Sequence, residues 1–365
     1  MKTIHIFTAL LFTSVFSTAQ VLKSLPPGGN KKATTTEQIG ITEVTIKYDR
    51  PGVKGREGKI YGTDIVHPGF VNLGFGTSKA APWRAGANEN TTIEFSTDVK
   101  IEGKDLPAGK YGFFVAYDPN ESILIFSKNS TSWGSYFYSE SEDVLRVKVK
   151  PQTLDKSVER LKYEFINQNE NSATVALQWE KLSFPFKVEV DLVKTQLDNL
   201  RLALRNKDGF KWEVSEQAAS LSLQNNTNLE EGLEWSDNAV SFDKNFTTLR
   251  TNAGLLEKLG KKEKADSTMK AAYAMGSMTE LHQYGRMLLN QKKNKEALEV
   301  FQLNAKKNPK QFTTYAGLTR GYSANGDYKT ALVNAKAALA SAPDDLNKKS
   351  VQGMIDKLQK GQDVN

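Results

Sequence analysis

The sequence predicts a multidomain protein, with an N-terminal all-β sandwich followed by a C-terminal all-α solenoid of helical hairpins. Up to Val190, apolar and polar residues alternate in short runs separated by turn residues, which is the period of a strand. After Asp191, apolar residues fall at helical spacing and small residues recur at a fixed interval. We therefore expect the domain boundary near Asp191.

The first residues have the features of an export signal. Lys2 supplies a positive charge, residues 4–16 are mainly apolar, and Ala19 ends a run of small residues before the expected cleavage site. We predict that residues 1–19 are a signal peptide and that the mature chain begins at Gln20. The apolar run is shorter than the roughly 20 residues of a membrane helix, and no other stretch approaches that length, so we predict no membrane span.

The composition limits the chemistry that the chain can perform. It contains no cysteine, which excludes disulfides, thiolate metal sites and cysteine nucleophiles. Of its three histidines, His5 lies in the predicted signal peptide, which leaves His67 and His282. The chain therefore has few of the histidines that zinc sites and Ser-His-Asp triads require. We predict no metal and no cofactor, and we favour a binding protein over an enzyme.

The positive charge is concentrated in the C-terminal half. Residues 20–192 carry 22 Lys+Arg and 22 Asp+Glu, whereas residues 193–365 carry 26 and 20. This excess fits lysines on solvated helix turns, or docking to an acidic surface. We expect no nucleic acid partner, because aromatic residues are not interleaved with these charges and the chain is predicted to be exported.

The expected β-domain covers residues 38–190. A lead-in over residues 20–37, rich in Pro, Gly and Thr, is predicted to be flexible. Strands are predicted at residues 44–48, 93–95, 99–101, 111–115, 123–126, 144–149, 161–165, 174–179 and 186–190. Two half-apolar sheets can bury their faces against each other in a sandwich, and a closed barrel is the alternative.

Residues 191–365 contain an internal repeat. Three pairs of positions lie 34 residues apart: Ala297 and Ala331, Phe301 and Ala335, Pro309 and Pro343. This is the tetratricopeptide (TPR) period, in which a small residue lets two antiparallel helices approach, a large one fills the groove and a proline ends the second helix.

Further helices are expected on both sides of this repeat. A third hairpin is predicted at residues 249–277, a degenerate fourth at residues 229–239, and a capping helix at residues 348–360. About three hairpins are needed to bury a continuous core. Because such solenoids hold protein or peptide partners along one face, that is the partner class we expect.

Several stretches of the β-domain resemble a known family. IGITEVTIKYDRPGVKGR at residues 39–56 and WRAGANENTT at residues 83–92 resemble domain-of-unknown-function family 2911, and shorter matches lie at residues 101–104, 106–111, 133–134 and 143–147. The resemblance covers roughly residues 38–190. It implies an exported protein of the periplasm or outer envelope of a Gram-negative bacterium. The family has no established activity that could be carried over to this chain. A longer loop at about residues 62–82 departs from the family's short form.

The basic, glycine-rich loop after the first predicted strand is a candidate anion site through Arg50 and Arg56. It does not fit the P-loop pattern, because Val53 stands where the first glycine belongs and Ile60 where Ser or Thr would bind a metal. Glycines that permit tight turning are the alternative, which we favour.

The segment 83–92 is the better ligand-binding candidate, through Trp83, Arg84, Asn88 and Glu89. A guanidinium fork, an amide and a carboxylate suit a small polar ligand such as a glycan or a carboxylated peptide. The alternative, which we favour, is structural. In that case Arg84 and Glu89 pair with each other or with Arg50, and Asn88 bonds to its own backbone in a turn.

Two functional hypotheses follow. The favoured one is a non-enzymatic exported scaffold whose repeats bind a protein or peptide. The rival is a glycan-binding or hydrolytic β-domain centred on segment 83–92, in which Asp143 could supply the second carboxylate beside Glu89. The aromatic cluster Trp133, Tyr136, Phe137 and Tyr138 could stack on sugars, although aromatic residues on a strand more often pack in a core.

Overall fold

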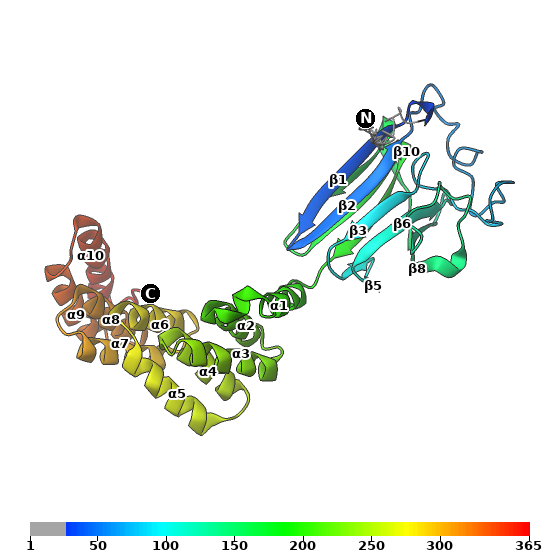
Figure 1. The fold of residues 1–365 in the computed structure, drawn as a ribbon. Helices are drawn as coiled ribbons and strands as arrows, with labels where there is room; N and C mark the ends of the chain where they lie inside the picture. Colours follow the sequence, from blue (N-terminus) through cyan, green and yellow to red (C-terminus); the bar gives the residue numbers. More distant parts are fainter. Residues whose placement is uncertain (1–26) are drawn as a thin grey trace, which may run out of the picture. The chain divides into compact units, whose positions relative to one another are not determined.

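The computed structural model describes residues 27–365, which form two compact units divided after Thr195 (Figure 1). The predicted signal peptide, residues 1–19, lies outside the described residues, as do residues 20–26 of the predicted lead-in. No helix in the described part combines the length and the apolar character needed to cross a membrane.

The first unit is built from two antiparallel sheets. One has the strand order β1-β2-β3-β6-β7-β8 and the other the order β5-β4-β10-β9. The strands are β1 (Lys31–Ile39), β2 (Thr42–Arg50), β3 (Thr91–Phe95), β4 (Val99–Ile101), β5 (Lys104–Leu106), β6 (Gly109–Ala116), β7 (Ser122–Ser127), β8 (Asp143–Val149), β9 (Gln152–Ile166) and β10 (Ser172–Glu189). Single-turn helices lie at η1 (Pro27–Gly29) and η2 (Glu140–Glu142).

Aromatic side chains from both sheets meet in one core. Phe113 of β6 and Phe126 of β7 lie 5.6 Å and 5.9 Å, between ring centroids, from Phe186 of β10 in the other sheet. In β2, Val44, Ile46 and Tyr48 are buried, while Lys47, between Ile46 and Tyr48, is exposed. The two sheets thus bury their apolar faces against each other, and this confirms the predicted all-β sandwich rather than a closed barrel.

The structure corrects the expected lead-in. Residues 31–37, which we predicted to be flexible, belong to β1, and β1 pairs with β2 in unbroken register from Lys31 opposite Arg50 to Ile39 opposite Thr42. Only Ile39 of this strand is fully buried. The edge strand forms because its backbone completes the ladder of β2, and its β-branched threonines tolerate the extended conformation. Our prediction relied on buried apolar residues, and it therefore missed this strand.

Two predicted strands near the end of this unit are one. Residues 174–179 and 186–190 both fall largely in β10, which pairs with β9 through register shifts around Glu180. Glu180 has φ near 50°, so the chain bulges there without leaving the sheet. The predicted strand at residues 161–165 is likewise only the C-terminal part of the longer β9.

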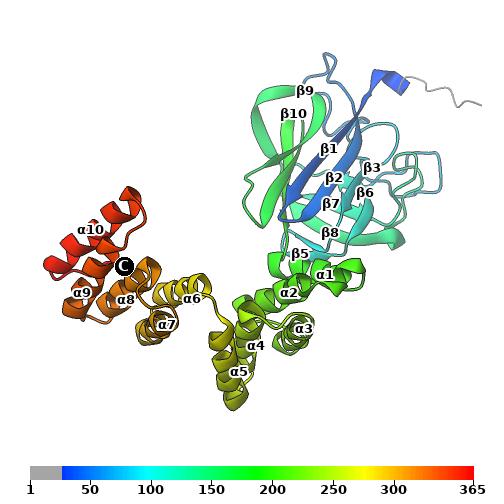
Figure 2. The ribbon, with the colours of Figure 1, turned by 60° about the vertical axis from the view of Figure 1, so that its left-hand side comes forward.

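The second unit is helical. Its helices are α1 (Leu192–Ala203, which begins in the first unit), η3 (Lys207–Phe210), α2 (Trp212–Asn225), α3 (Leu229–Phe242), α4 (Phe246–Lys258), α5 (Lys262–Met275), α6 (Met278–Asn290), α7 (Asn294–Lys307), α8 (Phe312–Ala324), α9 (Tyr328–Ala340) and α10 (Asp345–Gln359). Successive helices pack as the hairpins α2/α3, α4/α5, α6/α7 and α8/α9, with α10 against α9 (Figure 2). The hairpin predicted at residues 249–277 is α4/α5, and the predicted capping helix is α10. The fourth hairpin predicted at residues 229–239 is only the helix α3, whose partner α2 lies before that span.

The 34-residue repeat positions lie where the helices approach most closely. Ala297 and Ala331 are fully buried, and Phe301 of α7 fills the space between α6 and α8. A Cβ atom at Gly285 or Gly317 would lie only 2.5 Å or 2.6 Å from the Phe301 ring. The glycines thus make the room that this large side chain occupies.

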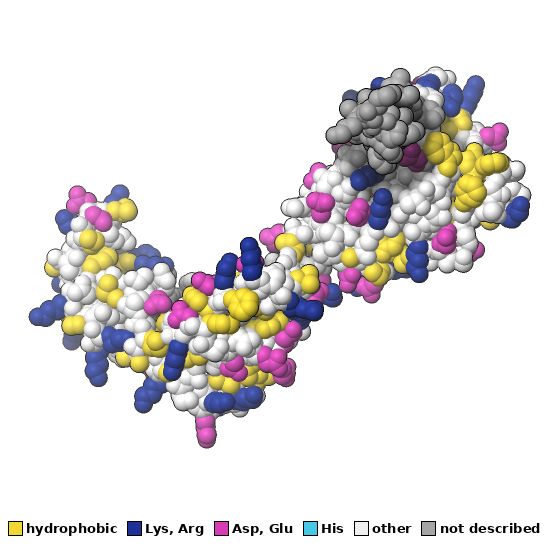
Figure 3. All heavy atoms as spheres, viewed as in Figure 1, with side chains coloured by type: hydrophobic (Ala, Val, Ile, Leu, Met, Phe, Trp, Pro, Cys, Tyr) yellow, Lys and Arg dark blue, Asp and Glu magenta, His cyan; other side chains and the backbone are white. Residues whose placement is uncertain are grey.

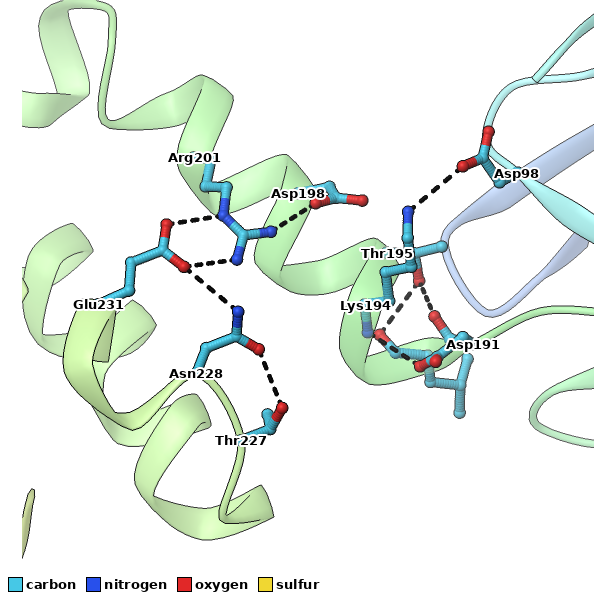
Figure 4. Close-up of polar contacts among 10 residues, drawn as sticks. Asp98, Asp191, Lys194, Thr195, Asp198, Arg201, Thr227, Asn228 and Glu231 are labelled. Carbon is cyan, nitrogen blue, oxygen red and sulfur yellow. Dashed lines mark hydrogen bonds and ion pairs between the residues drawn. The ribbon is translucent and has the colours of Figure 1, made fainter. Parts of the chain in front are cut away.

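The chain passes from strand to helix around Asp191, close to the expected boundary. At the start of α1, the Thr195 hydroxyl donates to the Asp191 carbonyl at 2.8 Å. Within the second unit, Arg201 of α1 donates from Nε and Nη2 to the two carboxylate oxygens of Glu231, at 2.8 Å and 2.6 Å (Figure 4). This bidentate pair joins α1 to α3.

Candidate functional site

The two arginines of the loop that we considered as a candidate anion site make hydrogen bonds inside the fold. Arg50 donates from Nε to the Leu161 carbonyl at 2.9 Å. Arg56 donates to the carbonyls of Val53 and Gly52 at 2.9 Å and 2.7 Å, so that it closes its own loop. These contacts support the structural alternative for both residues.

Trp83 belongs to the core of the sandwich. Its side chain is 4% exposed and its ring stacks on that of Trp179, with centroids 6.2 Å apart and planes inclined by 19°. The backbone of Trp83 exchanges hydrogen bonds with Val115 of β6 at 2.9 Å and 2.8 Å. The ring thus stabilises the sandwich, and a ligand outside the domain would not reach it.

The structure brings Arg84, Asn88 and Glu89 together on one loop, with partners other than those we expected. Arg84 donates from Nη1 to the backbone carbonyl of Asn88 at 2.7 Å, and its guanidinium lies 5.0 Å from the centre of the Tyr136 ring. Glu89 pairs with Lys32 of β1 at 2.7 Å, not with Arg84 or Arg50. The expected partners were wrong because β1, which supplies Lys32, was not predicted.

Lys32 also lies beside a buried carboxylate. Its Nζ is 3.5 Å from Asp49, whose side chain is 3% exposed. Burial raises the pKa of Asp49, and the positive charge of Lys32 opposes that rise. The hydrogen bond to Glu89 is the main cause that raises the pKa of Lys32. This cluster ties the edge strand to the loop 83–92 and gives the segment a structural role.

Asp143, considered as a second carboxylate beside Glu89, contacts other residues instead. The Tyr138 hydroxyl and Arg146 Nε each donate to Asp143 Oδ2 at 2.7 Å. The aromatic residues 133–138 lie in the loop between β7 and η2 rather than on a strand. Asp143 is thus held by Tyr138 and Arg146, whereas Glu89 is held by Lys32.

A second group of polar side chains lies in the helical unit, on the first helices of two successive hairpins. We call His282 and Arg286 of α6 and Arg320 of α8 the α6/α8 basic cluster. Burial, together with the charges of both arginines, lowers the pKa of His282 to about 4. Burial, together with the charge of Arg286, also lowers the pKa of Arg320. His282 is therefore neutral at pH 7, and the two arginines carry the charge.

The arginines of this cluster have unused donors. Among residues 27–365, neither the Arg286 nor the Arg320 guanidinium has a hydrogen-bond or ion-pair partner. Asp363 is near enough to oppose the lowering of the pKa of Arg320, but it forms no ion pair with it. Each guanidinium keeps five N–H donors in a planar fork that matches a carboxylate.

Sequence reasoning missed this cluster although a signal was present. Arg286 and Arg320 are separated by 34 residues, the same period as Ala297 and Ala331. Equal positions in successive repeats lie on the same side of neighbouring first helices, and α6 does contact α8. Within the described residues, no three His, Cys, Asp or Glu side chains gather in a way that could hold a metal ion.

The comparison with known families agrees with the resemblance found in the sequence. Residues 30–188 match the family described as protein of unknown function (DUF2911). This match covers the sandwich, which we call the DUF2911 domain after it, and the family's description gives no function. No curated protein matches the chain.

Solved structures similar to this chain include TPR proteins, which the helical repeats resemble in fold. YrrB, described as a TPR protein with an unusual peptide-binding site, is 17% identical, with a TM-score of 0.27 over 44% of this chain and 84% of YrrB. A tetratricopeptide repeat protein from Parabacteroides merdae is 17% identical, with a TM-score of 0.29 over 47% and 70% of the two chains. The C-terminal part of a TPR protein from Cytophaga hutchinsonii is 13% identical, with a TM-score of 0.31 over 46% and 67%.

Proposed function

We propose that this chain is an exported protein of the bacterial envelope whose TPR-like repeats bind an acidic segment of a protein partner. The observation that carries the proposal is the α6/α8 basic cluster, in which two unpaired arginines occupy equivalent positions of successive repeats. Carboxylates of a partner would satisfy both guanidinium groups at once. The DUF2911 domain is a second unit that this activity does not require.

Arg320 is half-buried and Arg286 is exposed, and the partial burial of Arg320 favours a binding role for that residue over a fully solvated one. A half-buried arginine loses part of its hydration, and no described residue offers the Arg320 guanidinium a hydrogen bond or an ion pair in its place. A carboxylate that fills this place regains charge-assisted hydrogen bonds, which are about twice as strong as neutral ones. The net positive charge of residues 193–365 would also speed the approach of an acidic partner.

The proposal is tested with the mature chain and two fluorescein-labelled peptides, one rich in Asp and Glu and one with Asn and Gln in their place. We expect the acidic peptide to bind more tightly in fluorescence anisotropy, and binding to weaken with added salt. Arg286→Ala or Arg320→Ala should reduce its affinity about 10-fold to 100-fold, because a hydrogen bond to a charged group contributes about 1.5–3 kcal/mol.

The matched control is Lys306→Ala, which removes an exposed positive charge from the second helix α7. Its affinity for the acidic peptide should equal that of the unmodified chain. Equal losses in all three variants would indicate general charge attraction and would contradict a defined arginine site.

The proposed location is tested separately. After expression of the full chain in a Gram-negative host, we expect the protein in the periplasmic fraction, with an intact mass that begins at Gln20. Recovery of a chain that retains residues 1–19 in the cytoplasmic fraction would contradict export and leave the binding proposal standing.

A further inference from the structure

A pocket of about 480 Å³ lies on the DUF2911 domain, and no residue of the segment 83–92 lines it. The loop 62–82, which departs from the short form of the family, supplies Phe70, Ser78 and Lys79 to its lining, and the η2 region and β8 supply Tyr138, Glu140 and Arg146. This volume falls within the roughly 300–1,000 Å³ of small-ligand sites. Polar and aromatic groups from segments far apart in the sequence thus meet in one place.

Arg146 is held rigidly at the edge of this pocket. Its Nε donates to Asp143 Oδ2 and its Nη2 to the Tyr138 hydroxyl, both at 2.7 Å. The Tyr138 hydroxyl in turn donates to Asp143, whose side chain is only 7% exposed. The negative charge of the buried Asp143 carboxylate neutralises the Arg146 guanidinium. Together with the hydrogen bond to Tyr138, this contact fixes the rotamer of Arg146 before a ligand binds.

The Nη1 group of Arg146 forms a weaker ion pair, with Glu140. Its Nη1 lies 2.9 Å from Glu140 Oε1, and the Glu140 side chain is 78% exposed. Exposed ion pairs of this kind contribute little, because water and salt screen them. Three of the five N–H donors of Arg146 are used in these contacts, and two are left.

Two further polar groups of the pocket lack partners. Ser78 is 4% exposed, and its hydroxyl has no hydrogen-bond partner within residues 27–365. Lys79, which is exposed, forms no ion pair or hydrogen bond with any described residue. An unpaired buried hydroxyl and an unpaired ammonium beside a half-used arginine are the donors that a hydroxylated, anionic ligand requires.

The pocket also offers an aromatic surface. Phe70 is 36% exposed, its ring centroid lies 6.3 Å from that of Tyr138, and the Arg146 guanidinium lies 5.3 Å from the centre of its ring. Further aromatic side chains are exposed nearby in the sequence, at Phe75 and Phe137. Figure 3 shows hydrophobic side chains on the loops of this domain. A ring with one apolar face could lie on Phe70 while its polar edge reaches Arg146.

We propose that this pocket binds a carboxylated sugar, whose ring stacks on Phe70 and whose carboxylate displaces Glu140 from Arg146. Glu140 then occupies, in the free protein, the place of the ligand's carboxylate. Lys79 adds charge attraction, and Ser78 can bond to a ring hydroxyl. A phosphate would use Arg146 equally well but would leave Phe70 without a ring to contact. The inference does not depend on the function proposed for the repeats.

The test is isothermal titration calorimetry of the mature chain with D-glucuronate, and with D-glucose as the matched neutral sugar. For a ligand of this size we expect a Kd on the order of 1 mM for glucuronate. Glucose should bind at least about 10-fold more weakly, because it lacks the carboxylate. An oligomer of uronic acid, titrated in parallel, distinguishes a polymer end from a free sugar acid as the source of the ligand.

Variants on the surface test the contacts without disturbing the fold. Lys79→Gln should weaken glucuronate binding about 3-fold to 10-fold, whereas Lys110→Gln, an exposed lysine of β6, should not change it. Glu140→Gln should tighten binding by a similar factor, because the ligand no longer competes with an internal carboxylate. Absence of glucuronate binding at 50 times the expected Kd, equal binding of glucose, or weaker binding by Glu140→Gln would each overturn the proposal.

Discussion

Phe301→Ala is expected to destabilise the helical repeats by about 3–5 kcal/mol, the usual cost of removing a fully buried phenylalanine. Phe301 is 1% exposed, and it is surrounded by Gly285, Gly317 and Gly321, which have no side chains that could move into the cavity. The groove between α6 and α8 should therefore stay empty. The measurement is thermal unfolding of the mature chain followed by circular dichroism at 222 nm, where the helices dominate.

The control for this prediction is Phe242→Ala. Phe242 ends α3, and its side chain is 53% exposed, so its loss should change the helical transition by less than about 0.5 kcal/mol. If both variants shifted the transition equally, Phe301 would not be the centre of the repeat core.

Trp83→Ala should destabilise the DUF2911 domain by about 3–5 kcal/mol while leaving the repeats folded. The ring of Trp83 stacks on Trp179 and lies 6.3 Å from the ring of Tyr61, between centroids. Removing it opens a large cavity in the middle of the sandwich. Urea unfolding followed by near-ultraviolet circular dichroism reports on this aromatic core.

Trp133→Ala is the matched control, because the Trp133 side chain is 46% exposed in a loop of the same domain. It should leave the midpoint in urea almost unchanged. If Trp83→Ala changed the urea midpoint as little as Trp133→Ala, Trp83 would not be a core residue. The ligand-binding role that we first considered for it would then be favoured again.

The periodic features of the fold could be predicted because each depends on residues near one another in the chain. Alternation at Val44, Ile46 and Tyr48 specifies which face of β2 is buried, whatever sheet that strand joins. The 34-residue spacing of Ala297 and Ala331 likewise specifies a hairpin contact. Burial of one face is a local property, and a single sequence encodes it directly.

The partners of the polar residues could not be predicted, because they depend on pairings between distant segments. Glu89 meets Lys32 only because β1 adds to the edge of the first sheet, and that strand has too few buried residues to produce an apolar signal. Electrostatic contacts have no period in the chain, so spacing alone does not reveal them.

The amino-acid sequence alone determined the order of the two domains, the boundary region near Asp191 and the tetratricopeptide character of the repeats. Only the tertiary structure decided that Trp83 is a core residue and that Arg146, Tyr138 and Asp143 form a cluster beside a pocket. The physical reason is range: hydrophobic periodicity acts along one element, whereas a binding site is made where elements from distant parts of the chain converge.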